Sequence, residues 1–218
     1  MLNYSTSEEN HIKAIYHLQK DGSVTTNELA AELKTRPASI TDMMKKLRTK
    51  KLVHYEAYKG FRLTAEGRKL ALIIIRRHRL WEFFLAEKLK FSWEEVHEVA
   101  EDLEHVSSKK LIDKLDEYLG FPRFDPHGDP IPDAQGRIET SKQVCLTELP
   151  PNKQGIVCYV SDQSSGMLEL LGHKKIGIGT RVEIRKRFSY DQSMEIKVKQ
   201  QITTISGDLA RNIFVKYD

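Results

Sequence analysis

The stretch that decides the N-terminal fold is "PASITDMMKKLRTKKLVHYEAYKGFRLTAEG", residues 37–67. Its first half places Ile40, Met43, Met44 and Leu47 at the spacing of one helix face. Its second half is rich in Val, Tyr and Phe and contains a turn sequence at Lys59 and Gly60. The stretch therefore predicts a helix followed by a two-stranded hairpin.

Two further helical patterns precede this stretch. Residues 10–21, "NHIKAIYHLQKD", carry apolar side chains at helical spacing and end before a glycine. Residues 24–33, "VTTNELAAEL", offer Thr25 or Thr26 as a helix cap, with Glu28 close behind. Helix, helix, turn, helix and hairpin form a winged helix-turn-helix, in which the third helix is the DNA-reading element.

The charge of this region supports a polyanionic partner. Residues 36–69 hold ten Lys or Arg and only three Asp or Glu. With the apolar face of the third helix buried, small polar side chains and lysines face outward, where base edges and phosphates would lie. A basic surface used for protein contacts is the alternative. The candidate DNA contacts on the third helix and the hairpin are Arg36, Ala38, Ser39, Thr41, Asp42, Lys45, Lys46, Tyr58, Lys59 and Arg62.

The following region has the opposite charge. Residues 80–120 hold eleven Asp or Glu and five Lys, which suggests cations as its ligands. Residues 67–89, "GRKLALIIIRRHRLWEFFLAEKL", predict a long helix with a broad apolar surface. A second subunit would bury part of that surface, and a winged helix that reads a palindrome also requires a dimer. We therefore expect a homodimer that binds double-stranded operator DNA.

Candidate metal ligands follow in "HEVAEDLEH", residues 97–105. On an ideal helix, four of its side chains fall within an arc of roughly 100°. These side chains are His97, Glu101, Glu104 and His105. His78 and Glu82 form a second imidazole–carboxylate pair at positions i and i+4. Mixed nitrogen and oxygen donors without sulfur favour a hard divalent ion such as manganese, whereas the solvated face of an amphipathic helix is the alternative.

The composition fits a soluble globular protein: of 218 residues, 39% are hydrophobic and 30% are charged. The longest apolar run, residues 70–75, is too short to cross a bilayer. Residues 1–11 lack the basic and apolar regions of a signal peptide. Two cysteines outside any CxxC motif fit free thiols, Cys145 and Cys158. We expect a cytoplasmic protein without a membrane partner.

The C-terminal third differs in character. Residues 120–138 are rich in Pro, Gly and Asp, which indicates a linker, although Asp125 and His127 are also polar candidates there. From Val144 onward the pattern changes to short β runs. We include "MLELLGHKK", residues 167–175, among the expected strands.

Several motifs together resemble the diphtheria-toxin-repressor family of metal-dependent transcription regulators. They are "ENHIKAIYHL", "LTAEGRKLA", "RRHRLWEFFL" and "VHEVAEDLEHVSS", and the resemblance covers essentially the whole chain. It implies a mainly α protein with a small all-β domain. The implied domains are a winged helix-turn-helix (1–70), a helical dimerisation and metal-binding domain with the linker (71–140), and an SH3-like barrel (141–218).

The same resemblance implies two metal sites. The primary site would use Asn10, Glu101, Glu104 and His105, joined by His78 in manganese-type members. The ancillary site would use His78, Glu82 and His97, with Asp125, His127 and Asp162 added in longer relatives. Iron-type members carry Cys at the position of Glu101, so Glu101 favours Mn(II) over Fe(II), although other divalent metals can substitute in vitro. Manganese-type members carry Asp at the position of Asn10 and often Glu at that of Lys13. Asn10 offers only a neutral carbonyl and Lys13 cannot bind a cation, which argues against a full two-ion manganese cluster.

The function that we expect is metal-dependent repression of metal-uptake genes, with no catalytic residues and no small-molecule substrate. An Fe(II)-dependent repressor of the same family is the nearest alternative. Two rivals come from other classes: a metallo-enzyme that uses the His/Glu cluster, and a winged-helix regulator that does not depend on metal.

Overall fold

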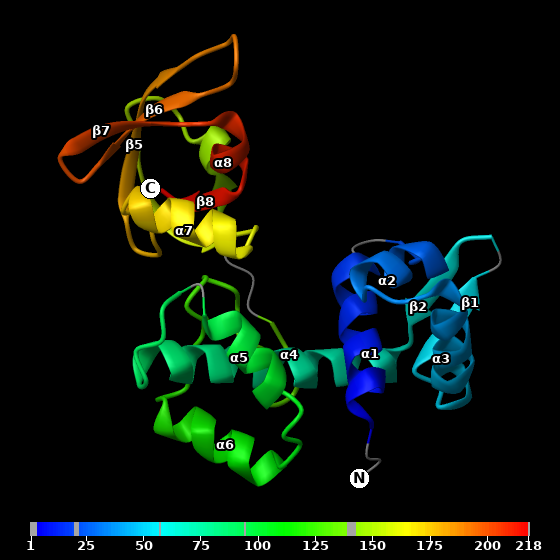
Figure 1. Cartoon of the computed structure of the whole chain (residues 1–218). Helices are drawn as coiled ribbons and strands as arrows, with labels where there is room; N and C mark the ends of the chain where they lie inside the picture. Colours follow the sequence, from blue (N-terminus) through cyan, green and yellow to red (C-terminus); the bar gives the residue numbers. More distant parts are fainter. Residues whose placement is uncertain (1–3, 20–21, 57, 94, 139–142, 218) are drawn as a thin grey trace. The chain divides into compact units, whose positions relative to one another are not determined.

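The computed structural model describes residues 4–19, 22–56, 58–93, 95–138 and 143–217. The chain divides into two compact units (Figure 1). The first unit comprises Met1–His78, Glu101–Leu115 and Pro132–Ile138. The second unit comprises Arg79–Ala100, Asp116–Ile131 and Glu139–Asp218.

The first unit contains the winged helix. Its elements are α1 (Thr6–Gln19), α2 (Thr26–Glu32), α3 (Pro37–Thr49), β1 (Val53–Glu56), β2 (Gly60–Leu63) and the first part of α4 (Ala65–Glu87). Strands β1 and β2 are antiparallel, as the hairpin prediction required. The expected cap of α2 is also present, because the Thr25 side chain accepts from the Glu28 backbone N–H and the Glu28 carboxylate accepts from the Thr25 N–H.

The core of the first unit follows from helical periodicity. Ile12 and Ile15 of α1 pack with Ile40, Met44 and Leu47 of α3, and all five are almost fully buried. The wing is fixed against the segment before α2 at Gly60, where φ is 116° and a Cβ would lie 2.3 Å from the Val24 carbonyl oxygen. Only glycine permits this approach.

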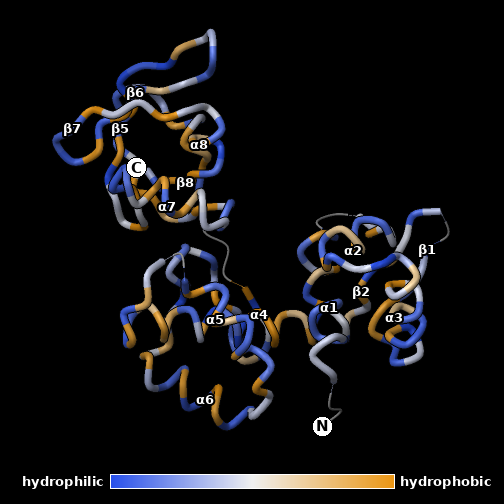
Figure 2. Tube along the Cα trace, in the orientation of Figure 1, coloured by the Kyte–Doolittle hydropathy of each residue, from blue (hydrophilic) through white to orange (hydrophobic). Residues whose placement is uncertain are grey.

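Two shorter helices follow α4 in the chain. They are α5 (Val96–Leu103) and α6 (Lys109–Tyr118). Figure 2 shows hydrophobic and hydrophilic residues alternating along α6, where Ile112 is buried while Leu111 is 42% exposed. Helix α5 ends at Leu103. His105 therefore lies beyond the helix on which the sequence placed it.

The C-terminal part of the second unit is built on one antiparallel sheet. Its elements are β3 (Val144–Cys145), a short 3-10 helix η1 (Leu146–Glu148), β4 (Gln154–Val160), α7 (Ser165–His173), β5 (Arg181–Arg187), β6 (Met194–Val198), β7 (Gln201–Ile205), α8 (Gly207–Arg211) and β8 (Ile213–Lys216). The strand order is β3-β8-β4-β5-β6-β7. Along β6, Met194, Ile196 and Val198 alternate into the core, as period-two patterning predicts.

One expected strand is wrong. Residues 165–173 form α7, although "MLELLGHKK" was predicted as a β run. Met167, Leu168 and Leu171 are buried at the spacing of a helix face. Met, Leu and Glu also favour helix over strand. A short apolar run cannot by itself distinguish a buried strand from a buried helix, which explains the error.

Candidate metal centres

Three buried side chains converge in the second unit. Glu82 of α4 meets Asp125 and His127 of the segment after α6. Each contributes one possible ligand atom, and these atoms lie within 4.8 Å of one another. Their residues are 1%, 5% and 0% exposed, respectively. We call this group the Glu82 centre.

A tight turn positions two of the three ligands. Asp125 Oδ1 accepts the backbone N–H of His127 at 2.8 Å and that of Asp129 at 2.9 Å. Gly128 closes the turn with φ at 90°, and a Cβ there would lie 2.0 Å from the Cys158 carbonyl oxygen of β4. The turn can therefore pack directly against the sheet only with glycine at this position. Asp125 and His127, which the sequence placed in a linker, are consequently buried.

The surroundings of His127 select one tautomer. Nε2 lies 3.2 Å from the carbonyl oxygen of Trp93, to which an Nε2–H donates. Nδ1 then carries the lone pair and lies 3.9 Å from Glu82 Oε1. Among the residues that the structure describes, Nδ1 has no hydrogen-bond partner although it is buried. An orphaned acceptor of this kind is available to a metal ion.

The charges of the Glu82 centre are incompletely balanced. Burial, followed by the charges of Glu82 and Asp129, raises the pKa of Asp125 well above its usual range. Arg79 opposes this, with Nε 3.5 Å from Asp125 Oδ2. Burial lowers the pKa of His127, which keeps the imidazole neutral and able to coordinate. Two buried carboxylates and a neutral imidazole therefore fit a divalent cation.

His97 of α5 adds a fourth donor at the edge of this centre. Its Nδ1 lies 3.1 Å from Glu82 Oε1, and its side chain is 44% exposed. The predicted proximity of His97 and Glu82 is thus present in the structure. The accessible imidazole lies on the solvent side of an otherwise buried group.

A second cluster lies in the first unit around Glu104, which is fully buried. His78 Nδ1 lies 2.6 Å from Glu104 Oε2, and His105 Nε2 lies 3.7 Å from Glu104 Oε1. Glu101 is exposed and borders the same hollow as Glu104 and His105. We call this group the Glu104 cluster. The single stripe predicted for residues 97–105 is therefore divided, with His97 in one group and Glu104 and His105 in the other.

Lys13 of α1 enters the Glu104 cluster. Its Nζ donates to both carboxylate oxygens of Glu104, at 2.6 and 2.7 Å. Burial acts to raise the pKa of Glu104, but contact with His78 and the charge of Lys13 outweigh it, so the pKa is lowered. Glu104 is therefore ionised and already paired.

Sequence reasoning missed Glu9, which is buried beside this cluster. Glu9 Oε2 lies 2.7 Å from His105 Nδ1, and Glu9 Oε1 accepts from Arg77 at 2.7 Å. An Nδ1–H that donates to Glu9 leaves His105 Nε2 facing Glu104. The signal in the sequence was weak, because Glu9 and Lys13 at positions i and i+4 look like an ordinary surface pair.

Two other candidate ligands, Asn10 and Asp162, belong to neither group of three converging ligands among the described residues. Asn10 is half-buried on α1 and borders the hollow beside Glu101 and Glu104. Asp162 is exposed, and its Oδ1 accepts the backbone N–H of Ser164 at 2.9 Å. Within the described ranges, Asp162 belongs to no group of three converging ligands.

The candidate DNA-binding residues form an accessible surface. From Arg36 to Lys46, the candidates on and before α3 are exposed, and so are Tyr58 and Lys59 of the wing. Arg62 is half-buried and pairs with Glu56 at 3.2 Å. On the side of α3 toward α1, Lys46 and Lys50 pair with buried Glu8 at 3.2 and 2.6 Å.

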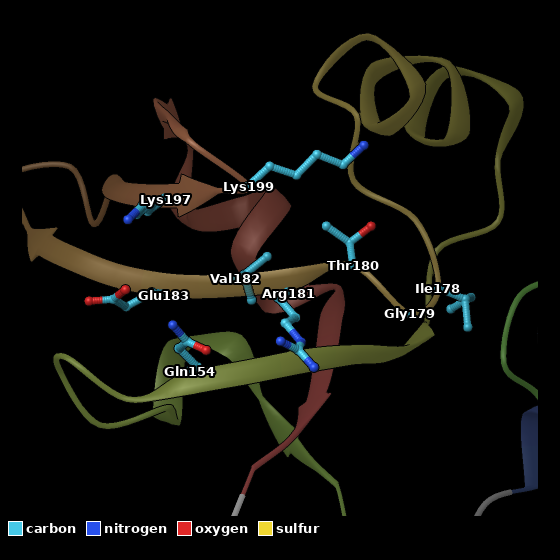
Figure 3. Close-up of a pocket in the computed structure, with 9 residues that line it drawn as sticks. All are labelled: Gln154, Ile178, Gly179, Thr180, Arg181, Val182, Glu183, Lys197 and Lys199. Carbon is cyan, nitrogen blue, oxygen red and sulfur yellow. The ribbon is translucent and has the colours of Figure 1, made fainter.

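A hollow in the sheet domain has a different chemistry. Figure 3 shows its lining residues on β4, β5, β6 and the adjoining loops; three of them are basic (Arg181, Lys197 and Lys199) and one is acidic (Glu183). None of the nine residues that line it is a histidine or cysteine. We therefore place no metal ligand there.

Comparison with known proteins identifies the family. Family models match residues 3–61 as the iron dependent repressor N-terminal DNA binding domain, 64–133 as its metal binding and dimerisation domain, and 144–217 as a FeoA domain.

Individual relatives agree with these models. The iron-dependent repressor IdeR of Mycobacterium leprae is 30% identical over 65% of this chain and 65% of its own length. The regulator MntR of Geobacillus kaustophilus is 32% identical over 61% of this chain and 95% of its own length. A solved structure described as a manganese-dependent transcriptional repressor in complex with manganese is 31% identical, covers 96% of this chain and 99% of its own, and gives a TM-score of 0.85.

In the described part of the chain, no helix is both long enough and apolar enough to cross a bilayer. The domain matches, the relatives and the shared architecture lead to one conclusion. The chain belongs to the diphtheria-toxin-repressor family of metal-dependent transcriptional repressors.

Proposed function

We propose that this chain is a Mn(II)-dependent repressor that binds operator DNA as a homodimer in the cytoplasm and controls metal-uptake genes. The observation that supports it best is the Glu82 centre, where buried carboxylates and an orphaned imidazole nitrogen converge. A divalent ion bound there would supply the positive charge that this group lacks. Fe(II) is the competing physiological metal.

The donor atoms support manganese over iron. Both candidate groups offer carboxylate oxygens and imidazole nitrogens. The two cysteines lie on β3 and β4, and Cys145 and Cys158 are occupied by contacts within the sheet domain. Hard oxygen donors with imidazole suit Mn(II), whereas thiolate would favour softer ions.

Helix α1 supports a connection between the Glu104 cluster and the DNA-reading helix. Glu8 forms ion pairs with Lys46 of α3 and with Lys50, the residue that caps the end of α3. The adjacent Glu9 contacts His105. Any ligand that favours one arrangement of His105 and Glu104 thereby also favours one position of α1 against α3. By linkage, metal shifts the population toward the DNA-competent arrangement by no more than its differential affinity for it.

The exposed surface of α3 and the wing supports DNA as the partner. Phosphate contacts from Lys and Arg would provide affinity, and small polar side chains at the start of α3 would reach base edges. Exposed apolar side chains support a dimer, since Ile73 and Leu111 of the first unit are each 42% exposed.

The test is selection of bound duplexes from a random-sequence DNA pool in the presence of Mn(II). Binding of a selected fluorescent duplex is then followed by anisotropy with Mn(II), with Fe(II) under anaerobic conditions, and with chelator. We expect tight binding with Mn(II) that chelator reverses. DNA binding that chelator does not change would support a metal-independent regulator. A lower Kd for the duplex with Fe(II) than with Mn(II) would support the iron-dependent alternative.

A further inference from the structure

The Glu104 cluster contains a cation supplied by the protein itself. Lys13 Nζ lies 2.6 and 2.7 Å from the two oxygens of Glu104 and 3.6 Å from Glu101 Oε1. The Lys13 side chain is 15% exposed, and that of Glu104 is 1% exposed. This is a largely buried ion pair, in which the ammonium bridges both oxygens of one carboxylate.

An ammonium in this position competes directly with a metal ion. Lysine has three N–H donors and no lone pair, so Lys13 can occupy the space of a cation but cannot coordinate one. The oxygens that it contacts are those that a divalent ion would use. A metal ion can therefore reach Glu104 only if the Lys13 side chain moves away.

At the Glu82 centre, a protein cation approaches a ligand carboxylate less closely. Arg79 Nε lies 3.5 Å from Asp125 Oδ2, and other guanidinium nitrogens of Arg79 donate to Pro130 O and Asp129 Oδ1, at 2.6 and 2.8 Å. Among the described residues, the buried His127 Nδ1 has no hydrogen-bond partner. The two groups thus differ in how closely Lys13 and Arg79 approach the ligand oxygens.

We propose that the Lys13 ammonium is the resident cation of the Glu104 cluster and that it lowers the affinity of this cluster for divalent metal. At limiting metal, each chain then holds one ion, at the Glu82 centre. A second ion enters only at higher concentration, by displacing Lys13 from Glu104. The inference rests on the proposed function, because it assumes that the chain binds a divalent ion.

The same ion pair has a structural consequence. Lys13 belongs to α1, and Glu104 follows α5. Their pairing holds α1 at the cluster without any metal. The contact between these two segments is therefore present before metal arrives.

The experiment counts bound Mn(II) by the loss of the free-ion EPR signal in the full-length protein. The variants are Lys13→Gln and, as a matched control, Lys34→Gln, since Lys34 borders the same hollow as Glu101 and Glu104. At a free Mn(II) concentration at which the wild type holds one ion per chain, we expect Lys13→Gln to hold two and Lys34→Gln to hold one. The affinity of the Glu104 cluster for Mn(II) should rise by about tenfold or more in Lys13→Gln.

A second readout is thermal. In chelator, Lys13→Gln should melt below the wild type because Glu104 loses its partner, and Mn(II) should raise its melting temperature more than that of the wild type. A count unchanged by Lys13→Gln would overturn the inference.

If Lys13→Gln does not fold, the same Mn(II) count is made on Glu104→Gln, in which Lys13 is unchanged. This variant should still hold one ion per chain at limiting Mn(II), and loss of that ion would overturn the inference. Failure of the proposed function looks different: the wild type would bind no Mn(II), and chelator would not change DNA binding.

Discussion

The substitution Glu82→Gln should change stability in opposite directions without and with metal. The Glu82 and Asp125 ligand oxygens lie within 4.8 Å of each other, and both residues are buried. Two full negative charges at that separation would repel by about 3 kcal/mol at an effective dielectric constant of ~20, and the raised pKa of Asp125 means that proton uptake relieves part of this repulsion. Arg79 offsets part of this repulsion, so about 1–2 kcal/mol remains to be relieved by the neutral amide.

In chelator, therefore, Glu82→Gln should raise the melting temperature. For a chain of this size, 1 kcal/mol corresponds to about 2–4 °C, which gives an increase of about 5 °C. The amide oxygen can still accept from His97, so that contact is retained. The pKa of Asp125 should fall but stay raised, because burial, its largest cause, is unchanged and only the smaller contribution of the Glu82 charge is removed.

With Mn(II) the order should reverse. Metal at about 100 times its Kd stabilises the wild type by about 2.7 kcal/mol, which is about 5–10 °C. Removal of one anionic ligand should abolish most of this increase in Glu82→Gln. The assay is differential scanning fluorimetry with and without Mn(II), and Glu87→Gln, an exposed acid on the same helix, is the control. A variant that melts lower in chelator and keeps the full Mn(II) shift would refute the reasoning.

Three further predictions concern separate parts of the chain. Lys45→Ala on exposed α3 should reduce the slope of log K against log salt for a selected duplex by about 0.9, whereas Lys110→Ala on α6 should leave the slope unchanged. Gly128→Ala should raise the Kd for Mn(II) in equilibrium dialysis by about 10-fold or more, because its Cβ would meet the Cys158 carbonyl oxygen at 2.0 Å and displace the turn that holds Asp125 and His127. Gly120→Ala, which has a similar positive φ but open space around it, should retain wild-type affinity. In a Trp81→Phe chain, Mn(II) should quench the emission of Trp93, whose ring stacks 5.5 Å from that of His127, and unchanged emission on saturation would contradict the assignment of His127.

The winged helix could be predicted from sequence because its periodicities are local. Ile40, Met44 and Leu47 mark one face of α3, and Gly60 follows a turn residue between two β-rich runs. The same reasoning gave alternating β6. It failed for α7, where three buried apolar residues were too few to distinguish helix from strand.

The candidate metal residues were predictable in type but not in grouping. A helical wheel put His97, Glu104 and His105 on one face, but α5 ends before Glu104, and burial of that carboxylate arises from packing with α1 and α4. The predicted pairing of His97 with Glu82 depended only on two helices facing each other, and it is present.

The burial of Asp125 and His127 could not be predicted from the sequence, because they lie in a Pro- and Gly-rich segment that is typical of an exposed linker. It arises because Gly128 lets the turn approach β4 within the distance that a side chain would occupy. Glu9 and the ion pair of Lys13 with Glu104 also depend on contacts between residues far apart in sequence, about which local patterns carry little information.

The most direct measurement is anomalous scattering at the manganese edge from crystals of the protein grown at limiting Mn(II). A peak should appear among the Glu82 carboxylate, the Asp125 carboxylate and His127 Nδ1, with Lys13 still against Glu104. Crystals that bind the metal elsewhere, with these three side chains turned away from one another, would contradict the account.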